Sequence, residues 1–182
     1  NLDMLQQYDV EEYNYNMLVA RFEPENNLEM ILDGVALCKD KTVFLVVWRH
    51  DANKFGAFLK NKYKSNSNIR FLGGIFNLEH LNNLRYYSKL YFHGHSVGGT
   101  NPSLLEAMAS KALIIANNNE FSKSILGEDA FYFSTKEDVK THLENVKKTY
   151  NKDKIDNCYF KIENEYMWEV INNKYLDFFH EC

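Results

Sequence analysis

Apolar and polar residues follow one another in blocks along the chain, and the blocks switch between two spacings. Short runs without polar alternation, such as Val43–Trp48, predict strands that are buried on both faces. Between such runs, apolar residues recur at intervals of three and four, as in 28–35, which is the spacing of one helix face. The pattern therefore predicts strands and helices in alternation.

The predicted elements define a fold class. The predicted strands are 16–20, 42–48, 69–73, 89–93, 112–116 and 130–133, and the predicted helices are 28–35, 57–62, 78–87, 102–110 and everything after Lys136. Buried strands that alternate with helices indicate parallel βα units. We therefore predict an α/β fold, a doubly wound, mostly parallel, Rossmann-like sheet of about six strands with helices on both faces and a helical C-terminus.

Composition and charge exclude several classes of protein. The 182 residues are 45% hydrophobic, which suits a single globular domain. A net charge of -4 argues against nucleic acid as a partner. The longest apolar run is too short to span a bilayer, and we expect no transmembrane segment. Cys38, Cys158 and Cys182 are widely spaced, which predicts reduced thiols in a cytoplasmic protein.

In an open sheet of this kind, ligands bind beyond the carboxyl ends of the strands, where the strand order reverses. Three predicted loops lie on that edge, at 21–27, 73–79 and 93–102. A dinucleotide-binding dehydrogenase would carry its glycine fingerprint in the first of them. Residues 20–27 contain no glycine, so an NAD enzyme is disfavoured.

The third loop has the features of an anion site. Gly98 and Gly99 carry no side chain, so a ligand can approach their backbone N–H groups closely. Asn101 is suited to cap a helix that begins at Pro102. The free N–H groups and the dipole at that helix N-terminus favour phosphate.

Two charged residues extend the anion site to a nucleotide. Arg21, in the first loop, would face the same crevice and clamp phosphate. Glu106, just over one turn into the helix, could accept hydrogen bonds from vicinal hydroxyls such as those of a ribose. Taken alone, Glu106 would more often be a solvated surface residue. Together these features indicate a nucleoside diphosphate.

Two histidines, His93 and His95, flank Gly94 in the same loop. A pair of this kind is more often hydrogen-bonded scaffolding than a catalytic base. Its spacing suits a metal, but no third Asp, Glu or Cys ligand is evident nearby, so we expect no metal.

Residues 16–179 resemble the C-terminal, nucleotide-sugar-binding half of GT-B glycosyltransferases. The likeness is to the retaining family-four type, whose glycan-assembly members include rhamnosyltransferases. It is carried by the runs "MLVARFEPENNLEMILDGV" at 17–35, "HGHSVGGTNPSLLEAMA" at 93–109 within a longer match at 68–119, and "YMWEVINNKYLDFF" at 166–179. The resemblance implies sugar transfer from a nucleotide diphosphate-sugar to an acceptor hydroxyl with retained anomeric configuration, in bacterial glycan or polysaccharide assembly. No metal or other cofactor is implied, and the chain contains no D-x-D pair.

The resemblance also implies roles for individual residues. Arg21 would contact the diphosphate, the backbone near Ile75 would meet the base, and Glu106 would bind the ribose hydroxyls. The amides of Gly98, Gly99 and Thr100 would lie at the phosphate and sugar. The catalytic positions would be His95, Gly98 and Glu106.

Two positions depart from the family pattern. The family usually has a glutamate eight positions before Glu106, where this chain has Gly98, so that contact would come from backbone amides or from His95. It also usually has a lysine five or six residues after the arginine, where this chain has Asn26 and Asn27. Lys123 is a candidate substitute.

The resemblance predicts a two-part organisation. The chain begins at Asn1 without a methionine, and we expect 1–15 to be a lead-in from a missing domain and 16–182 to be the donor-binding domain. The missing N-terminal domain would bind the acceptor and would provide any peripheral attachment to the inner membrane. The isolated chain would then bind nucleotide sugar but transfer nothing. The alternative is a non-catalytic binding module whose site has decayed, which Gly98 and Asn26 favour.

Overall fold

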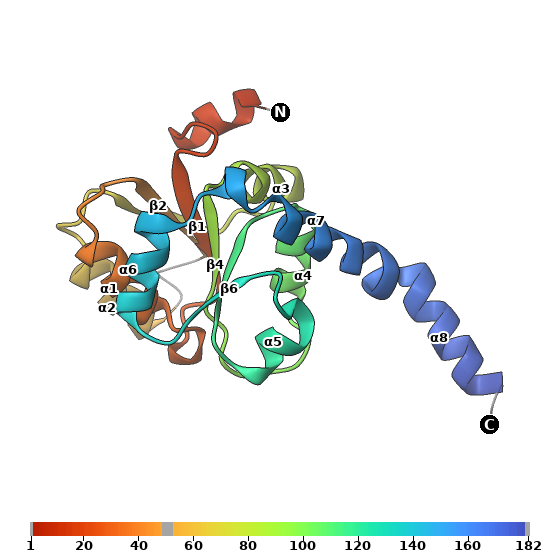
Figure 1. The fold of residues 1–182 in the computed structure, drawn as a ribbon. Coiled ribbons are helices and arrows are strands. Elements are labelled where there is room, and N and C mark those ends of the chain that lie inside the picture. The colour runs from red at the N-terminus through yellow and green to blue at the C-terminus, as the bar shows by residue number, and fades with distance from the viewer. Residues whose placement is uncertain (1, 49–52, 181–182) are drawn as a thin grey trace.

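The computed structural model describes residues 2–48 and 53–180 (Figure 1). Its centre is one six-stranded sheet in the order β3-β2-β1-β4-β5-β6, and every neighbouring pair of strands is parallel. The strands are β1 Tyr15–Val19, β2 Val43–Val47, β3 Ile69–Gly73, β4 Leu90–His93, β5 Ile114–Asn117 and β6 Phe131–Phe133. The predicted number of strands and their parallel arrangement are confirmed. The strand order reverses between β1 and β4.

Helices cover both faces of the sheet, as a doubly wound fold requires. They are α1 Leu28–Leu37, α2 Lys54–Lys62, α3 Leu78–Tyr87, α4 Pro102–Ala109, α5 Glu120–Leu126, α6 Lys136–Asn145, α7 Lys152–Lys161 and α8 Trp168–His180. One apolar cluster joins the sheet to α1, α2 and α6, and a second joins it to α3, α4 and α5 (Figure 1).

The two clusters explain why the strands read as unbroken apolar runs. In β1, Leu18 packs into the cluster with α1, whereas Met17 and Val19 pack into the cluster with α4. Successive side chains of a strand point to opposite faces. Because both faces are covered, every position of β1 is buried, including the polar Asn16, and the strand shows no regular polar alternation.

The structure contains one helix, α5, that the sequence pattern does not predict. Asn119 caps it by accepting a hydrogen bond from the Ser122 N–H at 2.9 Å, and Gly127 ends it with a φ of +55°. The helix spans only seven residues and its buried apolar side chains, Ile125 and Leu126, both lie in its last turn. A stripe that short gives no detectable helical period.

The predicted helical C-terminus is confirmed, and it consists of three separate helices, α6, α7 and α8. α6 ends at Asn145, and the next residue, Val146, takes an extended backbone and is buried in the cluster with α1. The next long helix, α7, packs against α4 on the other face of the sheet, so the chain must leave the helical path to cross between the faces. A π-helical turn at Ile162–Tyr166 then precedes α8, which extends away from the sheet (Figure 1).

Residues before β1 belong to the packed part of the molecule. A 3₁₀ helix at Leu2–Tyr8 buries Met4 and Leu5 in the cluster with α3. The Tyr8 hydroxyl also hydrogen-bonds to Nδ1 of His80 on α3 at 2.9 Å. The predicted lead-in is therefore fixed on this domain.

Two further sequence predictions concern cysteines and membranes. Cys38 and Cys158 are buried free thiols, and Cys182 lies outside the described residues. No helix in the described ranges combines the length and the apolar character needed to cross a membrane.

Candidate functional site

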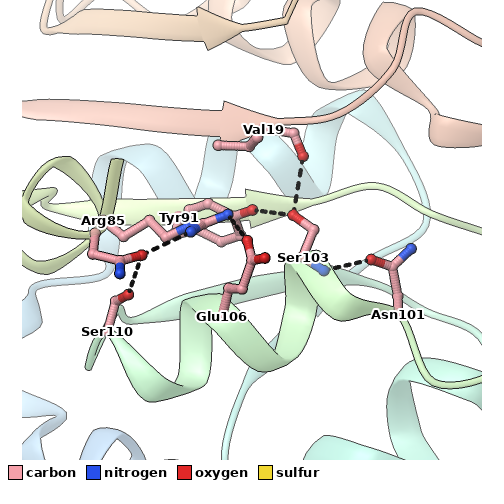
Figure 2. Close-up of polar contacts among 8 residues, drawn as sticks. Val19, Arg85, Tyr91, Asn101, Ser103, Glu106 and Ser110 are labelled. Carbon is pink, nitrogen blue, oxygen red and sulfur yellow. Dashed lines mark hydrogen bonds and ion pairs between the residues drawn. The ribbon is translucent and has the colours of Figure 1, made fainter. Parts of the chain in front are cut away.

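The point where the strand order reverses lies between β1 and β4. The two strands pair in parallel, with Leu18 opposite Phe92, so the loops that follow them leave the same edge of the sheet as neighbours. The backbone oxygen of Val19, the last residue of β1, accepts a hydrogen bond from the Ser103 hydroxyl at 3.4 Å (Figure 2). The first turn of α4 therefore sits against the end of β1. This is where ligands bind in open α/β sheets.

Hydrogen bonds fasten the loop after β1 to the loop after β4. The Asn27 side chain donates to the Gly94 carbonyl at 2.8 Å. Both the N–H and the hydroxyl of Ser96 donate to the Glu25 carbonyl, at 3.0 and 2.8 Å. A Cβ on Gly94 would overlap the backbone oxygen of Asn26, so only glycine permits this approach. The two loops therefore form one unit.

Asn26 and Asn27 have a structural role that sequence reasoning did not find. Asn26 is buried, and its amide donates to the carbonyl of Arg21 at 2.8 Å. Asn27 has a φ of +51°, a conformation that asparagine tolerates better than lysine. At the positions where the resemblance expects a lysine, this chain thus has two residues that shape the loop. The only indication of this role in the sequence is the pair of asparagines directly before a predicted helix.

Arg21 and His95 lie close together at this edge. Arg21 is exposed just beyond the end of β1. Burial lowers the pKa of His95, and the positive charge of Arg21 lowers it further while Glu25 opposes the change. His95 is therefore neutral at neutral pH and available as a hydrogen-bonding group beside a fixed positive charge.

His93 stacks on His95, with ring centroids 4.5 Å apart. Its side chain is only 2% exposed, and burial, with a contribution from His95, lowers its pKa to about 3. His93 is thus neutral and internal, and its Nδ1 has no hydrogen-bond partner within the described residues. Within 2–48 and 53–180, no group of three or more His, Cys, Asp or Glu side chains could hold a metal ion.

The glycine-rich loop and the start of α4 have the predicted local geometry. Gly98 has a φ of +105°, a conformation that strains any residue with a Cβ, and a Cβ on Gly98 or Gly99 would meet nothing within 4 Å. The loop is exposed through Thr100. Asn101 caps α4 by accepting a hydrogen bond from the Ser103 N–H at 2.9 Å, and the helix begins at Pro102. The predicted helix start is confirmed.

Glu106 is held by a residue that sequence reasoning missed. Its Oε2 accepts a hydrogen bond of 2.6 Å from Nη2 of Arg85 on α3 (Figure 2). The Glu106 side chain is 46% exposed, whereas that of Arg85 is fully buried. No contact among the described residues joins Glu106 to Arg21. The hydrogen bond between Ser103 and Val19 ties the first turn of α4 to the end of β1, and Glu106 follows in the next turn of that helix.

Ile75 and Lys123 complete the predicted set. Ile75 lies in the loop between β3 and α3, with its side chain partly buried against the cluster that includes α3 and α4. Lys123 lies on α5, with its ammonium 5.9 Å from the centre of the Tyr132 ring. In the described part of the chain, Lys123 makes no contact with Arg21 or Glu106.

Solved structures with the same fold include several glycosyltransferases. The Anabaena protein HepE, solved in complex with UDP-glucose, matches with a TM-score of 0.82 and 13% identity over 99% of this chain and 52% of its own. A glycosyltransferase from Rickettsia africae matches with a TM-score of 0.81 and 15% identity over 98% and 50%. The C-terminal domain of the group 1 glycosyl transferase LpcC from Francisella tularensis matches with a TM-score of 0.74 and 16% identity over 92% and 93%.

These comparisons define the extent of the likeness. The chain spans about half the length of HepE and of the Rickettsia enzyme, but nearly all of the LpcC domain. At such identities the likeness shows a common fold. No protein-family model matches the sequence, and no curated protein matches it significantly.

Proposed function

We propose that this chain is the donor-binding half of a retaining glycosyltransferase, which moves a sugar from a nucleotide diphosphate-sugar to an acceptor hydroxyl. One observation carries the proposal: Arg21, the Gly98–Thr100 loop and the α4 N-terminus lie at the edge of the sheet where the strand order reverses, and Glu106 follows in the second turn of α4. A protein of the same fold was solved with UDP-glucose, which supports this class of ligand.

The residues at this edge suit the charges of such a donor. The diphosphate would lie against the N–H groups at the start of α4 and beside Arg21, which together stabilise the negative charge that grows as the sugar leaves. Glu106 would accept a hydrogen bond from the ribose. Neutral His95 and the amides of the glycine loop would contact the phosphate and sugar where the usual glutamate is absent. The proposal needs no metal cofactor.

We further propose that an acceptor-binding domain completes the enzyme. The chain spans about half of the full-length structures that it resembles. The α8 helix extends from the sheet (Figure 1), and its large apolar side chains, including Trp168 at 78% and Phe179 at 69%, are exposed. Such a surface is typical of an interface. The isolated chain should therefore bind donor and transfer nothing, and robust turnover by this chain alone would contradict the two-domain proposal.

A second candidate function is a non-catalytic nucleotide-sugar-binding module with a decayed site. The buried, loop-shaping Asn26 favours it, because the lysine expected there is replaced by a structural residue. The φ of Gly98 also favours it, because a glutamate would be strained there.

Nucleotide binding tests the proposal directly. We expect UDP, GDP or dTDP, or one of their sugars, to bind in calorimetric titrations. Arg21→Ala and Glu106→Ala should each weaken binding by about 1–3 kcal/mol, the usual effect of losing a charged hydrogen-bond partner. Lys152→Ala is the matched control, because Lys152 is an exposed cation of α7 that pairs with Asp156. Its affinity should equal that of the wild type.

Other outcomes of the same titration separate the alternatives. Binding of NAD in place of these nucleotides would indicate a dinucleotide enzyme. No binding of any of the three nucleotides or their sugars would reject an intact donor site and favour the decayed module.

A further inference from the structure

Arg85 is the largest fully buried side chain of the domain, and it carries a charge. Its guanidinium hydrogen-bonds to Oε2 of Glu106 at 2.6 Å and to Oδ1 of Asn82 at 3.0 Å (Figure 2). It also lies 6.0 Å from the centre of the Tyr91 ring. One buried cation of α3 is thus directed at the half-exposed carboxylate of α4 that would bind the ribose.

Stability alone does not account for this arrangement. Removing a guanidinium from water has a large free-energy cost, and replacing a buried ion pair by apolar side chains is often neutral or stabilising. Here the cost is only partly compensated, since Nε of Arg85 has no hydrogen-bond partner within the described part of the chain. A buried arginine under these conditions indicates a role in placing its partner.

We propose that Arg85 is a positioning residue, which fixes the Glu106 carboxylate so that the site selects ligands with ribose hydroxyls. The inference rests on the proposed function. It adds Arg85 to the site and a preference for ligands that carry ribose hydroxyls.

The guanidinium is itself fixed on its far side. Nη1 of Arg85 donates to Asn82, whose Oδ1 also accepts a hydrogen bond of 3.3 Å from the Ser110 hydroxyl at the end of α4. The series Ser110, Asn82, Arg85 and Glu106 therefore links α4 to α3 and back to α4. A planar guanidinium held at both amino groups can present a hydrogen bond in only one direction.

This bond determines what Glu106 can offer a ligand. Oε2 is occupied by Arg85, while Oε1 accepts no hydrogen bond within residues 2–48 and 53–180. An unrestrained glutamate on a helix surface would sample several rotamers, and a ligand would have to order it. With one oxygen fixed, the other is preorganised to accept a ribose hydroxyl.

The experiment compares the best-binding nucleoside diphosphate with its 2′,3′-dideoxy counterpart by calorimetry. Wild type should prefer the hydroxylated ligand by about tenfold or more, the usual effect of a hydrogen bond to a charged group. Arg85→Met should reduce that preference to less than about threefold, close to the value for Glu106→Ala. The double variant should show no further loss, because both changes remove the same interaction.

Further variants control for folding. Arg70→Met removes an arginine of β3 that is only partly buried and pairs with Asp9 at 3.2 Å, and this variant should keep the full preference. Asn82→Ala removes the hydrogen bond to Nη1 of Arg85. Asn82 is exposed, so this variant should fold even if Arg85→Met does not. It should reduce the preference for the hydroxylated ligand about two- to threefold.

The outcomes separate this inference from the proposed function. If Arg85→Met folds and keeps the wild-type preference for the hydroxylated ligand, the positioning role of Arg85 is overturned and the proposed function is not. If Arg85→Met does not fold, the same result in Asn82→Ala has the same meaning. A wild-type chain that binds the nucleotide without any preference for the hydroxyls would also overturn it but leave nucleotide binding intact. A wild-type chain that binds no nucleoside diphosphate would overturn both.

Discussion

Gly94→Ala should destabilise the fold by about 3 kcal/mol or more and abolish nucleotide binding. The new Cβ would overlap the backbone oxygen of Asn26 and come within 3.0 Å of Cδ1 of Ile31. A backbone oxygen cannot rotate away as a side chain can. Relief requires separation of the loops after β1 and β4, which would break the hydrogen bond from Asn27 to the Gly94 carbonyl. Urea unfolding and calorimetric titration of the nucleotide measure the two effects.

Gly99→Ala is the matched control for this substitution. It lies five residues further along the same loop, and its Cβ would meet nothing within 4 Å. We expect a stability change within about 0.5 kcal/mol, as for an ordinary surface substitution. If Gly94→Ala were as stable as Gly99→Ala and bound nucleotide as well as the wild type, the two loops would not form the unit described above.

Acidification from pH 6.5 to 4.5 should destabilise the protein by about 2–3 kcal/mol through His93 alone. Burial lowers the pKa of His93 to about 3 in the folded protein, whereas an unperturbed histidine titrates near pH 6.5. Between these values the unfolded chain binds a proton that the folded protein does not bind. Stability is therefore full above about pH 6.5 and falls by up to about 1.4 kcal/mol for each lower pH unit. Urea unfolding at half-unit steps of pH measures the slope.

His93→Phe removes the titrating group and keeps an aromatic ring on β4. We expect a shallower slope between pH 6.5 and 4.5, with the remainder due partly to His95, whose pKa burial also lowers. Asp33 and Asp129 have lowered pKa values and lose their stabilising contribution only below this window. An unchanged slope in His93→Phe would show that His93 is not the buried neutral group described here.

Local signals in the sequence were sufficient for the sheet and for the start of α4. Strands covered on both faces are mainly apolar, so an unbroken run such as Val43–Val47 can be recognised as a strand without knowledge of its neighbours. Asn101 and Pro102 act within one helical turn, and the structure places the helix start where they predict it. The helix α5 was missed because a seven-residue segment gives too short an apolar period.

The sequence by itself determined the fold class, the edge of the sheet on which a ligand would lie, and the candidates Arg21 and Glu106. Only the tertiary structure decided how the site is held together. Asn27 meets Gly94 across 67 residues, and Arg85 meets Glu106 across 21 residues. Helix periods, caps and turns express forces between residues a few positions apart, so they carry information about the elements themselves. Which side chains meet between elements depends on packing in three dimensions, and that requires the folded chain.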